Sequence, residues 1–359
     1  MDELPRQALL AELDAISLTE PHADQRLRRL KVLLPKVRQL GDEALLARLF
    51  IEQGKNHALL FEFAEAQTLL NEGIRLATRL ELSGLLLEGR LAQGGIHYGN
   101  GDFFRALEVW LKTLEEASKF SQMNLCAQAY VGIGKVYYAF DDFSSAVRAH
   151  AMAQEIANGL GDLRLSCEIA INLAADYYRL HDTASSMASI IQAQQIMAQG
   201  KLDLPEWDGE ISSYIGLIHF EQGDYERAEA HLLSALAILR ACGSVWGQVH
   251  VQLALGRTYL KLGDPRRASD YLKEVVAQQS LGVVGGMQVQ TEELLAGLLV
   301  EQGDYQGALH HYKRLQQLQS EQFRSHGTTL RLSKHMLGRL ADLEFRLQLE
   351  RYRLQLASE

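Results

Sequence analysis

The sequence repeats itself about every forty residues, and this period limits the possible folds more than any other feature. A turn of the form Gly-Asp-x-x-x-Ala recurs along the chain, and the residue after the Asp marks each copy. The markers are Phe63, Phe103, Phe143, Thr183, Tyr225, Pro265 and Tyr305, spaced by 40, 40, 40, 42, 40 and 40 residues. Such self-similarity is typical of solenoids, in which each unit packs only on its neighbours.

Each copy has the composition of two helices joined by a tight turn. Nine residues before every marker stands a small residue: Gly54, Gly94, Gly134, Ala174, Gly216, Gly256 and Ala296. The Gly of the turn favours the end of one helix, and the Asp can cap the start of the next. We therefore predict a helix A, a turn and a helix B in each unit, with the small residue of A facing the Ala three residues after the marker.

These motifs resemble the tetratricopeptide repeat (TPR) family. The signature is matched by Gly134-Lys135-Val136-Tyr137 followed by Asp142-Phe143-Ser144-Ser145-Ala146, although the repeat is forty residues long instead of 34. The resemblance implies an all-α fold, a right-handed TPR superhelix (α-solenoid) with a long C-terminal helix. We expect a degenerate N-terminal repeat or cap over residues 1–43, seven repeats over 44–320, and a coiled-coil-like linker or capping helix over 321–359.

The C-terminal segment carries an apolar seam at helical spacing: Met336, Leu340, Leu343, Leu347 and Leu354. Such a seam needs a partner, which is either the last repeat of the same chain or the same helix of a second copy in a homodimer. The pattern continues up to Glu359 without a cap, so we expect a further output domain to follow. This architecture resembles the sensory region of bacterial signalling proteins, in which a coiled coil leads into a GGDEF diguanylate cyclase, a kinase or a DNA-binding domain. The alternative is a free-standing TPR adaptor for complex assembly.

Charge and composition limit the classes of partner that the chain can bind. Residues 313–359 hold nine Lys/Arg and five Asp/Glu, whereas the rest of the chain holds 27 against 40, a net charge of −13. An acidic body repels phosphate backbones, so we expect no nucleic-acid partner. The three cysteines are far apart, and no apolar run is long enough to cross a membrane. We therefore expect a cytoplasmic protein with no membrane contact.

Motifs for catalysis are missing from the sequence. It contains no His-Glu-x-x-His, no Gly-x-x-x-x-Gly-Lys-Ser/Thr, no Gly-x-Ser-x-Gly and no Gly-x-Gly-x-x-Gly. His310 and His311 are adjacent, so on a helix they point about 100° apart and cannot share one metal. We expect a solvent-exposed pair there, and no enzyme, cofactor or metal site in this chain.

The TPR resemblance also implies a ligand groove, because helix A lines the concave face in that family. If the groove positions of the family are those one and four residues after the small residue, they hold a row of aromatic residues in this chain, the aromatic ladder, with Lys and Arg residues beside them. The predicted ligand-binding residues are Tyr98, Lys135, Tyr138, Asn172, Tyr178, Arg179, Phe220, Arg257 and Lys261. Asn172 stands where forty-residue TPR proteins often bond a peptide backbone. This set suits an extended or helical peptide with apolar anchors and acidic groups; the alternative is that the ladder packs between repeats.

Overall fold

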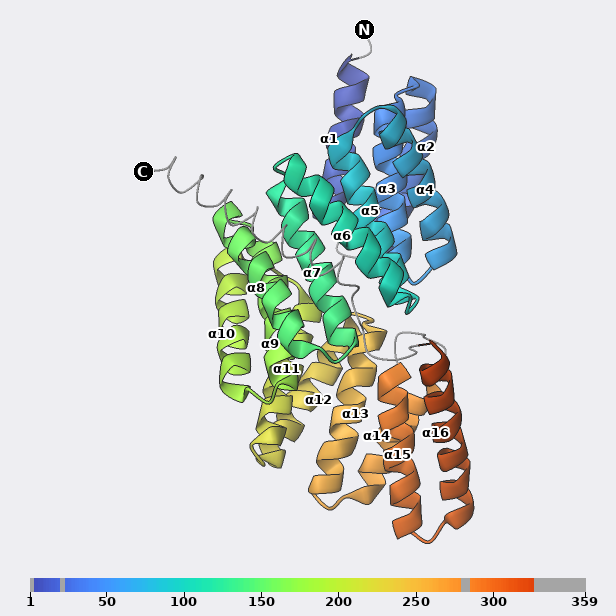
Figure 1. Ribbon diagram of the computed structural model, residues 1–359, viewed down its shortest axis with the longest axis vertical. Helices are drawn as coiled ribbons and strands as arrows, with labels where there is room; N and C mark the ends of the chain where they lie inside the picture. Colours follow the sequence, from blue (N-terminus) through green and yellow to red (C-terminus); the bar gives the residue numbers. More distant parts are fainter. Residues whose placement is uncertain (1–2, 20–22, 279–284, 326–359) are drawn as a thin grey trace. The chain divides into compact units, whose positions relative to one another are not determined.

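The computed structural model describes residues 3–19, 23–278 and 285–325, and within these ranges it holds sixteen α-helices and no strand (Figure 1). Each of the seven marker residues is the first residue of a helix B. The predicted all-α solenoid of helix-turn-helix repeats is therefore confirmed. The contacts group the chain into two compact units, which divide within α7, between Val136 and Tyr137.

Unit 1 begins with a leading helix pair and continues with the first repeats. Its helices are α1 (Glu3–Thr19), α2 (Ala23–Leu40), α3 (Glu43–Leu59), α4 (Phe63–Arg79), α5 (Ser83–Gly99), α6 (Phe103–Lys119) and the first part of α7 (Met123–Ala139). The leading pair packs on α3 through a cluster that includes Leu13, Ile16, Leu30 and Leu49, all 2 % exposed or less. Helix α2 thus occupies the place of a helix B ahead of the first repeat.

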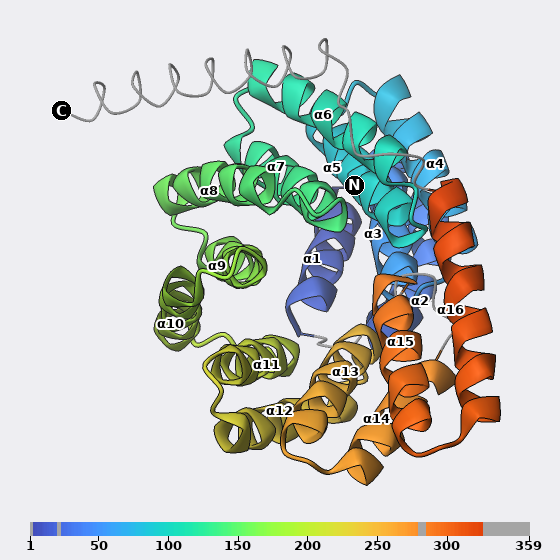
Figure 2. The ribbon, with the colours of Figure 1, turned by 60° about the horizontal axis from the view of Figure 1, so that its bottom comes forward.

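Unit 2 holds the end of α7 and the remaining repeats. Its other helices are α8 (Phe143–Leu160), α9 (Leu163–Arg179), α10 (Thr183–Gly200), α11 (Pro205–Glu221), α12 (Tyr225–Ala241), α13 (Val245–Lys261), α14 (Pro265–Ala277), α15 (Gly285–Glu301) and α16 (Tyr305–Ser325). Helices α9, α11 and α13 lie on the inner side of a curved double layer, and α10, α12 and α14 lie on the outer side (Figure 2). We call the side formed by α9, α11 and α13 the inner face.

The repeated turn uses the predicted chemistry. Gly223 adopts φ +80°, the left-handed conformation that ends α11, and Asp224 then caps α12 by accepting a hydrogen bond from the Arg227 N–H at 3.2 Å. In the weaker copies the same left-handed position holds a residue with a side chain, as at His181 with φ 60°. The backbone conformation is therefore kept where the glycine is not.

The small residue of each helix A allows the close approach of helix B. A Cβ added to Gly216 would lie 2.8 Å from Leu232 Cγ and 3.2 Å from the carbonyl oxygen of Ala228, the residue predicted to face it. A Cβ added to Gly54 would meet Leu70 and the carbonyl of Ala66 in the same way. This recurring contact sets the spacing of the helix pairs, and so it aligns the inner-face positions from one repeat to the next.

Candidate functional site

A chain of aromatic rings links the three A helices of the inner face. Tyr178 on α9 meets Tyr214 on α11 with ring centroids 6.2 Å apart, and Tyr214 meets His250 on α13 at 5.9 Å. His250 in turn stacks on Trp246, one helical turn earlier, at 5.4 Å. Tyr214 is buried, whereas Tyr178 and His250 are partly exposed. The rings therefore form a continuous, partly accessible surface across three repeats.

Two arginines lie against aromatic rings of the preceding repeat. The Arg257 guanidinium lies 4.8 Å from the centroid of Phe220, and that of Arg179 lies 4.3 Å from Phe143 and 5.5 Å from Tyr138. Such cation–π contacts hold the planar guanidinium in one orientation while its N–H donors stay available at the edge. Both arginine side chains remain more than a third exposed, at 37 % and 38 %. The inner face thus presents positioned cations beside its aromatic rings.

The ion pairs of these arginines differ in length. Arg179 pairs with Asp141 at 2.9 Å, the distance of a direct charge-assisted hydrogen bond. The pair of Arg257 with Glu221 is 4.0 Å long. Glu221 also accepts a hydrogen bond from the Tyr178 hydroxyl at 3.2 Å. We call Tyr178, Tyr214, Phe220, Glu221, His250 and Arg257 the inner-face cluster.

The electrostatics of the cluster reflect burial and the two arginines. The pKa of His250 is lowered to about 4, mainly by burial and additionally by the positive charges of Arg179 and Arg257. The pKa of Tyr178 is raised to about 12, mainly by burial and additionally by Glu221, with Arg257 acting in the opposite direction. Around pH 7 the imidazole and the phenol are therefore neutral, and the arginines supply the positive charge of the surface.

The predicted ladder is half-buried and packs inside its own repeats. Tyr98, Tyr138 and Phe220 each contact the first residue of their own helix B, with centroid distances of 5.3, 5.4 and 5.5 Å to Phe103, Phe143 and Tyr225. Tyr98 lies in unit 1 and also packs on Trp110. Each of these rings combines a packing contact with a partly exposed edge, and binding by these residues stays a prediction.

The polar residues of the predicted set are less alike. The Asn172 side-chain amide donates to the Glu168 carbonyl of its own helix at 3.0 Å, so this donor already has an internal partner. Lys261 is the last residue of α13 and is exposed. Lys135 lies on α7 within unit 1, half-buried. Of the nine predicted residues, the structure joins Tyr138 to Arg179, Tyr178 to Arg257 through Glu221, and Arg257 to Phe220.

Sequence reasoning missed Tyr214, His250 and Glu221. Tyr214 lies two residues before its small residue Gly216, and His250 lies six before Gly256, so both extend the inner-face stripe by a further turn or two toward the helix N-terminus. Apart from Asn172, which lies at the same repeat position as Tyr214, the predicted residues all come after the small residue. A full helical stripe, followed at spacings of three and four, would have included both rings.

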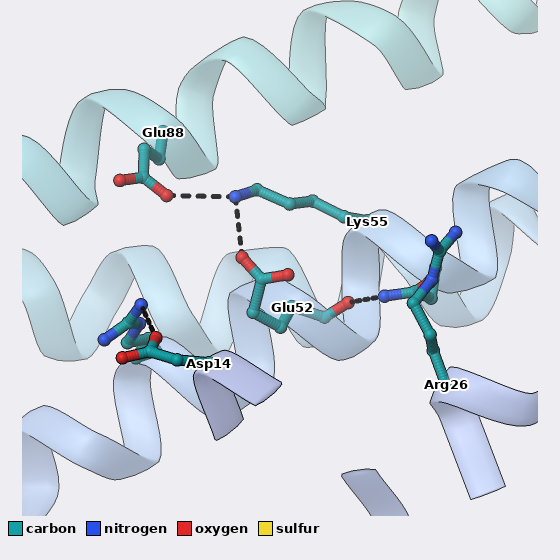
Figure 3. Close-up of polar contacts among 7 residues, drawn as sticks. Asp14, Arg26, Glu52, Lys55 and Glu88 are labelled. Atoms are coloured by element: carbon teal, nitrogen blue, oxygen red, sulfur yellow. Dashed lines mark hydrogen bonds and ion pairs between the residues drawn. The ribbon is translucent and has the colours of Figure 1, made fainter. Parts of the chain in front are cut away.

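In unit 1 a different polar network surrounds Lys55, on the first helix A (Figure 3). Lys55 on α3 lies between Glu52 and Glu88, with Nζ–O distances of 2.8 and 2.9 Å. Nearby, Arg48 pairs with Asp14 of α1 at 2.6 Å. Arg26 of α2 donates to the Asn56 side chain, also at 2.6 Å. The charged groups of this network therefore have polar partners at short distances.

One expectation about histidines is wrong. His311 is only 17 % exposed and its Nδ1 lies 2.6 Å from the buried carboxylate of Glu292, so it is not a solvated surface residue. The pairing arises because α16 packs on α15, which local sequence does not reveal. Among the described residues, no group of three or more His, Cys, Asp and Glu could hold a metal ion.

The remaining expectations concern the C-terminal seam and a membrane-spanning helix. The C-terminal seam residues Met336, Leu340, Leu343, Leu347 and Leu354 lie outside the described residues. None of the helices that the structure describes is long and apolar enough to cross a membrane.

Comparisons with known proteins support the fold. Residues 209–279 and 253–323 match family models described as tetratricopeptide repeat, so the chain carries TPR repeats in unit 2. No curated protein matches the sequence.

Several solved structures are similar. NprR in complex with its cognate peptide NprX has a TM-score of 0.63 and 14 % identity, covering 96 % of this chain and 98 % of that one. A Rap protein complexed with Competence and Sporulation Factor has a TM-score of 0.60 and 14 % identity, covering 90 % and 100 %. Aspartyl phosphate phosphatase F from Bacillus subtilis has a TM-score of 0.55 and 11 % identity, covering 82 % and 81 %. At these identities the likeness concerns the fold alone.

Proposed function

We propose that this chain is a regulatory TPR scaffold that binds a peptide or protein segment on the inner face of unit 2. The observation that carries the proposal is the inner-face cluster, in which partly exposed rings alternate with an arginine held against Phe220. Aromatic and Arg side chains supply most of the binding energy at protein interfaces. NprR, which shares the fold, is described in complex with a cognate peptide, and this supports a peptide as the ligand.

The direction of the aromatic chain favours an extended ligand. Tyr178, Tyr214 and His250 come from three successive A helices, so a ligand in contact with all three crosses the helices instead of entering a single pocket. An extended peptide can place side chains against successive repeats in this way. The proposed ligand is therefore a short peptide or an unstructured protein segment.

A selection experiment tests the proposal. A library of random heptapeptides is selected on the intact chain, and the best binder is measured against Tyr138→Ala/Tyr178→Ala. We expect this double variant to lose at least tenfold in affinity, because it removes two aromatic surfaces from the inner side. Tyr271→Ala is the matched control, since Tyr271 stacks on Tyr259 from α14 in the outer layer. Circular dichroism checks folding, and full affinity in the folded double variant would contradict the proposal.

A regulatory role requires an output, and here the proposal rests on the sequence. The basic segment after α16 carries an apolar heptad seam, which favours a coiled coil between the repeats and an output domain such as a diguanylate cyclase. The homodimer and the cytoplasmic location belong to the same proposal. The intact mass of the native gene product tests it: an excess of about 100 residues or more over 40.2 kDa supports an output domain. A mass equal to that of this chain favours the free-standing adaptor.

A further inference from the structure

The Glu221 carboxylate accepts one hydrogen bond and has two cationic or titratable side chains near it, neither of them at the distance of a tight ion pair. The Tyr178 hydroxyl donates to its Oε1 at 3.2 Å, and Arg257 lies 4.0 Å from the same oxygen. His181 Nδ1 lies 4.0 Å from Oε2. Charge-assisted N–H···O bonds normally measure about 2.7–2.9 Å. The carboxylate therefore neutralises its surroundings without closing a direct bond to Arg257.

The repeat register places this carboxylate among cations. Glu221 is the fourth residue before its marker, Tyr225; the same position holds Arg179 in the preceding repeat and Lys261 in the following one. Helix ends in equivalent repeats lie in line along a solenoid, so this row reads cation, carboxylate, cation along the inner face. Glu221 is thus an acid supplied by the chain itself between the basic residues of the two neighbouring repeats, and the row continues with Glu301 in the last repeat.

The surroundings of Glu221 suit a carboxylate from a ligand equally well. Arg257 is held in place by the Phe220 ring at 4.8 Å, and an arginine positioned in this way loses little entropy when it binds a second carboxylate. The Glu221 side chain is 29 % exposed and sits at the last residue of α11, where it has room to turn toward solvent. Exchange of one carboxylate for another keeps the site neutral, which avoids leaving a charge without a partner.

We propose that Glu221 is an internal stand-in for the ligand, and that acidic peptides displace it to pair one of their carboxylates with Arg257 and the Tyr178 hydroxyl. The inference rests on the proposed function, because it names the chemistry of the ligand for the same surface. It also makes Glu221 a selectivity residue, because only a ligand whose carboxylate binds Arg257 more strongly than Glu221 does can displace it. Removing the Glu221 charge therefore increases affinity, whereas removing the Arg257 charge decreases it.

The test uses an acidic heptapeptide selected on the intact chain and labelled with fluorescein. We expect Glu221→Gln to bind it about tenfold more tightly and Arg257→Met to bind it at least tenfold more weakly. Arg267→Met is the matched control, because Arg267 also lies over a tyrosine ring, 5.3 Å from Tyr259, but on the outer helix α14. Binding of the control variant should be unchanged. Gln keeps the size of Glu and can still accept the Tyr178 hydrogen bond, so the variant is expected to fold.

Two altered peptides identify the carboxylate that binds. One replaces every Asp and Glu by Asn and Gln, and the other carries an amidated C-terminus. If the peptide without Asp and Glu loses affinity for the intact chain and no longer responds to Glu221→Gln, the carboxylate that binds is a side chain. If the amidated peptide does so instead, the carboxylate is the C-terminus of the peptide. If both altered peptides bind as tightly as the parent, or if Glu221→Gln leaves affinity unchanged or lowers it, the inference is wrong while the proposed function stands. If the library gives no inner-face binder, both are wrong.

Discussion

Lys55 in unit 1 and Arg257 in unit 2 occupy the same position of the repeat, one residue after the small residue of helix A. Lys55 has two carboxylates within 2.9 Å, one from its own helix and one from the next helix A. Arg257 has one carboxylate at 4.0 Å and rests on an aromatic ring. The same backbone position is therefore fully paired in one unit and only loosely paired in the other.

This difference shows how a repeat separates stability from binding. A lysine fixed between Glu52 and Glu88 would have to break two short contacts before it could bind a ligand. An arginine supported by a ring keeps its orientation and gives up only one long contact. We therefore regard the paired positions of unit 1 as structural and the loosely paired positions of unit 2 as the ligand surface.

The largest expected difference between the two units concerns the close contact between the small residue of helix A and helix B. A Cβ on Gly94 would overlap the rigid indole of Trp110, whereas a Cβ on Gly256 would meet the flexible end of Leu272 at 2.7 Å. We expect Gly94→Ala to destabilise the chain by about 3 kcal/mol and Gly256→Ala by about 1 kcal/mol. Chemical denaturation measures both. Gly95→Ala is the control, because a Cβ there meets nothing within 4 Å, and it should be neutral or stabilising.

Removal of the two cations tests the comparison directly. Although burial lowers the pKa of Lys55, Glu52 and Glu88 raise it above its ordinary value, as expected for an ammonium held by two acids. We expect Lys55→Met to destabilise unit 1 by about 2 kcal/mol, since it leaves two carboxylates facing each other, and Arg257→Met to change stability by less than about 1 kcal/mol. Hydrogen exchange resolves the two units. Equal losses would remove the distinction between them.

Acid should weaken unit 2 through His250. Its folded pKa of about 4 lies below the ordinary value of 6.5, so the neutral imidazole is favoured by folding. The stabilisation from the neutral imidazole is fully present above about pH 6.5 and declines as the pH falls toward 4. At pH 5 about 2 kcal/mol of it is lost. The stability difference between the unsubstituted chain and His250→Gln should shift by that amount between pH 7 and pH 5. A difference independent of pH would show that His250 is not shielded as described.

The smallest expected effect lies in the turns. Among the described residues from Gly223 to Gly303, every left-handed position is a glycine, whereas unit 1 places Glu81 in this conformation with φ 55°. A residue with a side chain costs about 1–2 kcal/mol of stability in this conformation. Glycine avoids this cost, but its greater flexibility in the unfolded chain offsets part of the gain. We expect Glu81→Gly to raise stability by about 0.5–1 kcal/mol, measured by thermal unfolding. Gly101→Ala, at φ 78°, should have the opposite sign.

The helix pattern could be predicted because it depends on local chemistry. Each Gly-Asp turn stops one helix and caps the next, so the markers Phe103, Tyr225 and Pro265 give the first residue of a helix B without knowledge of the rest of the fold. The close contact of Gly216 with Ala228 follows from the same periodicity.

The pairing of charges could not be predicted, because it joins residues from different repeats. Lys55 and Arg257 share a repeat position, and although Glu52 three residues before Lys55 is visible in the sequence, the second acid, Glu88, comes from the next repeat. The roles of Tyr214 and Glu221 likewise depend on how successive A helices pack, which a pattern within one helix does not specify.

Photo-crosslinking tests the central claim most directly. A selected heptapeptide carrying a photoreactive benzophenone is irradiated on the intact chain, and the attached residues are located by mass spectrometry. We expect the crosslinks to fall on α9, α11 and α13, around Tyr178, Tyr214 and His250, and to be prevented by excess unlabelled peptide. Competed crosslinks confined to α3 and α5, around Lys55 and Glu88, would contradict the assignment of the ligand surface to unit 2.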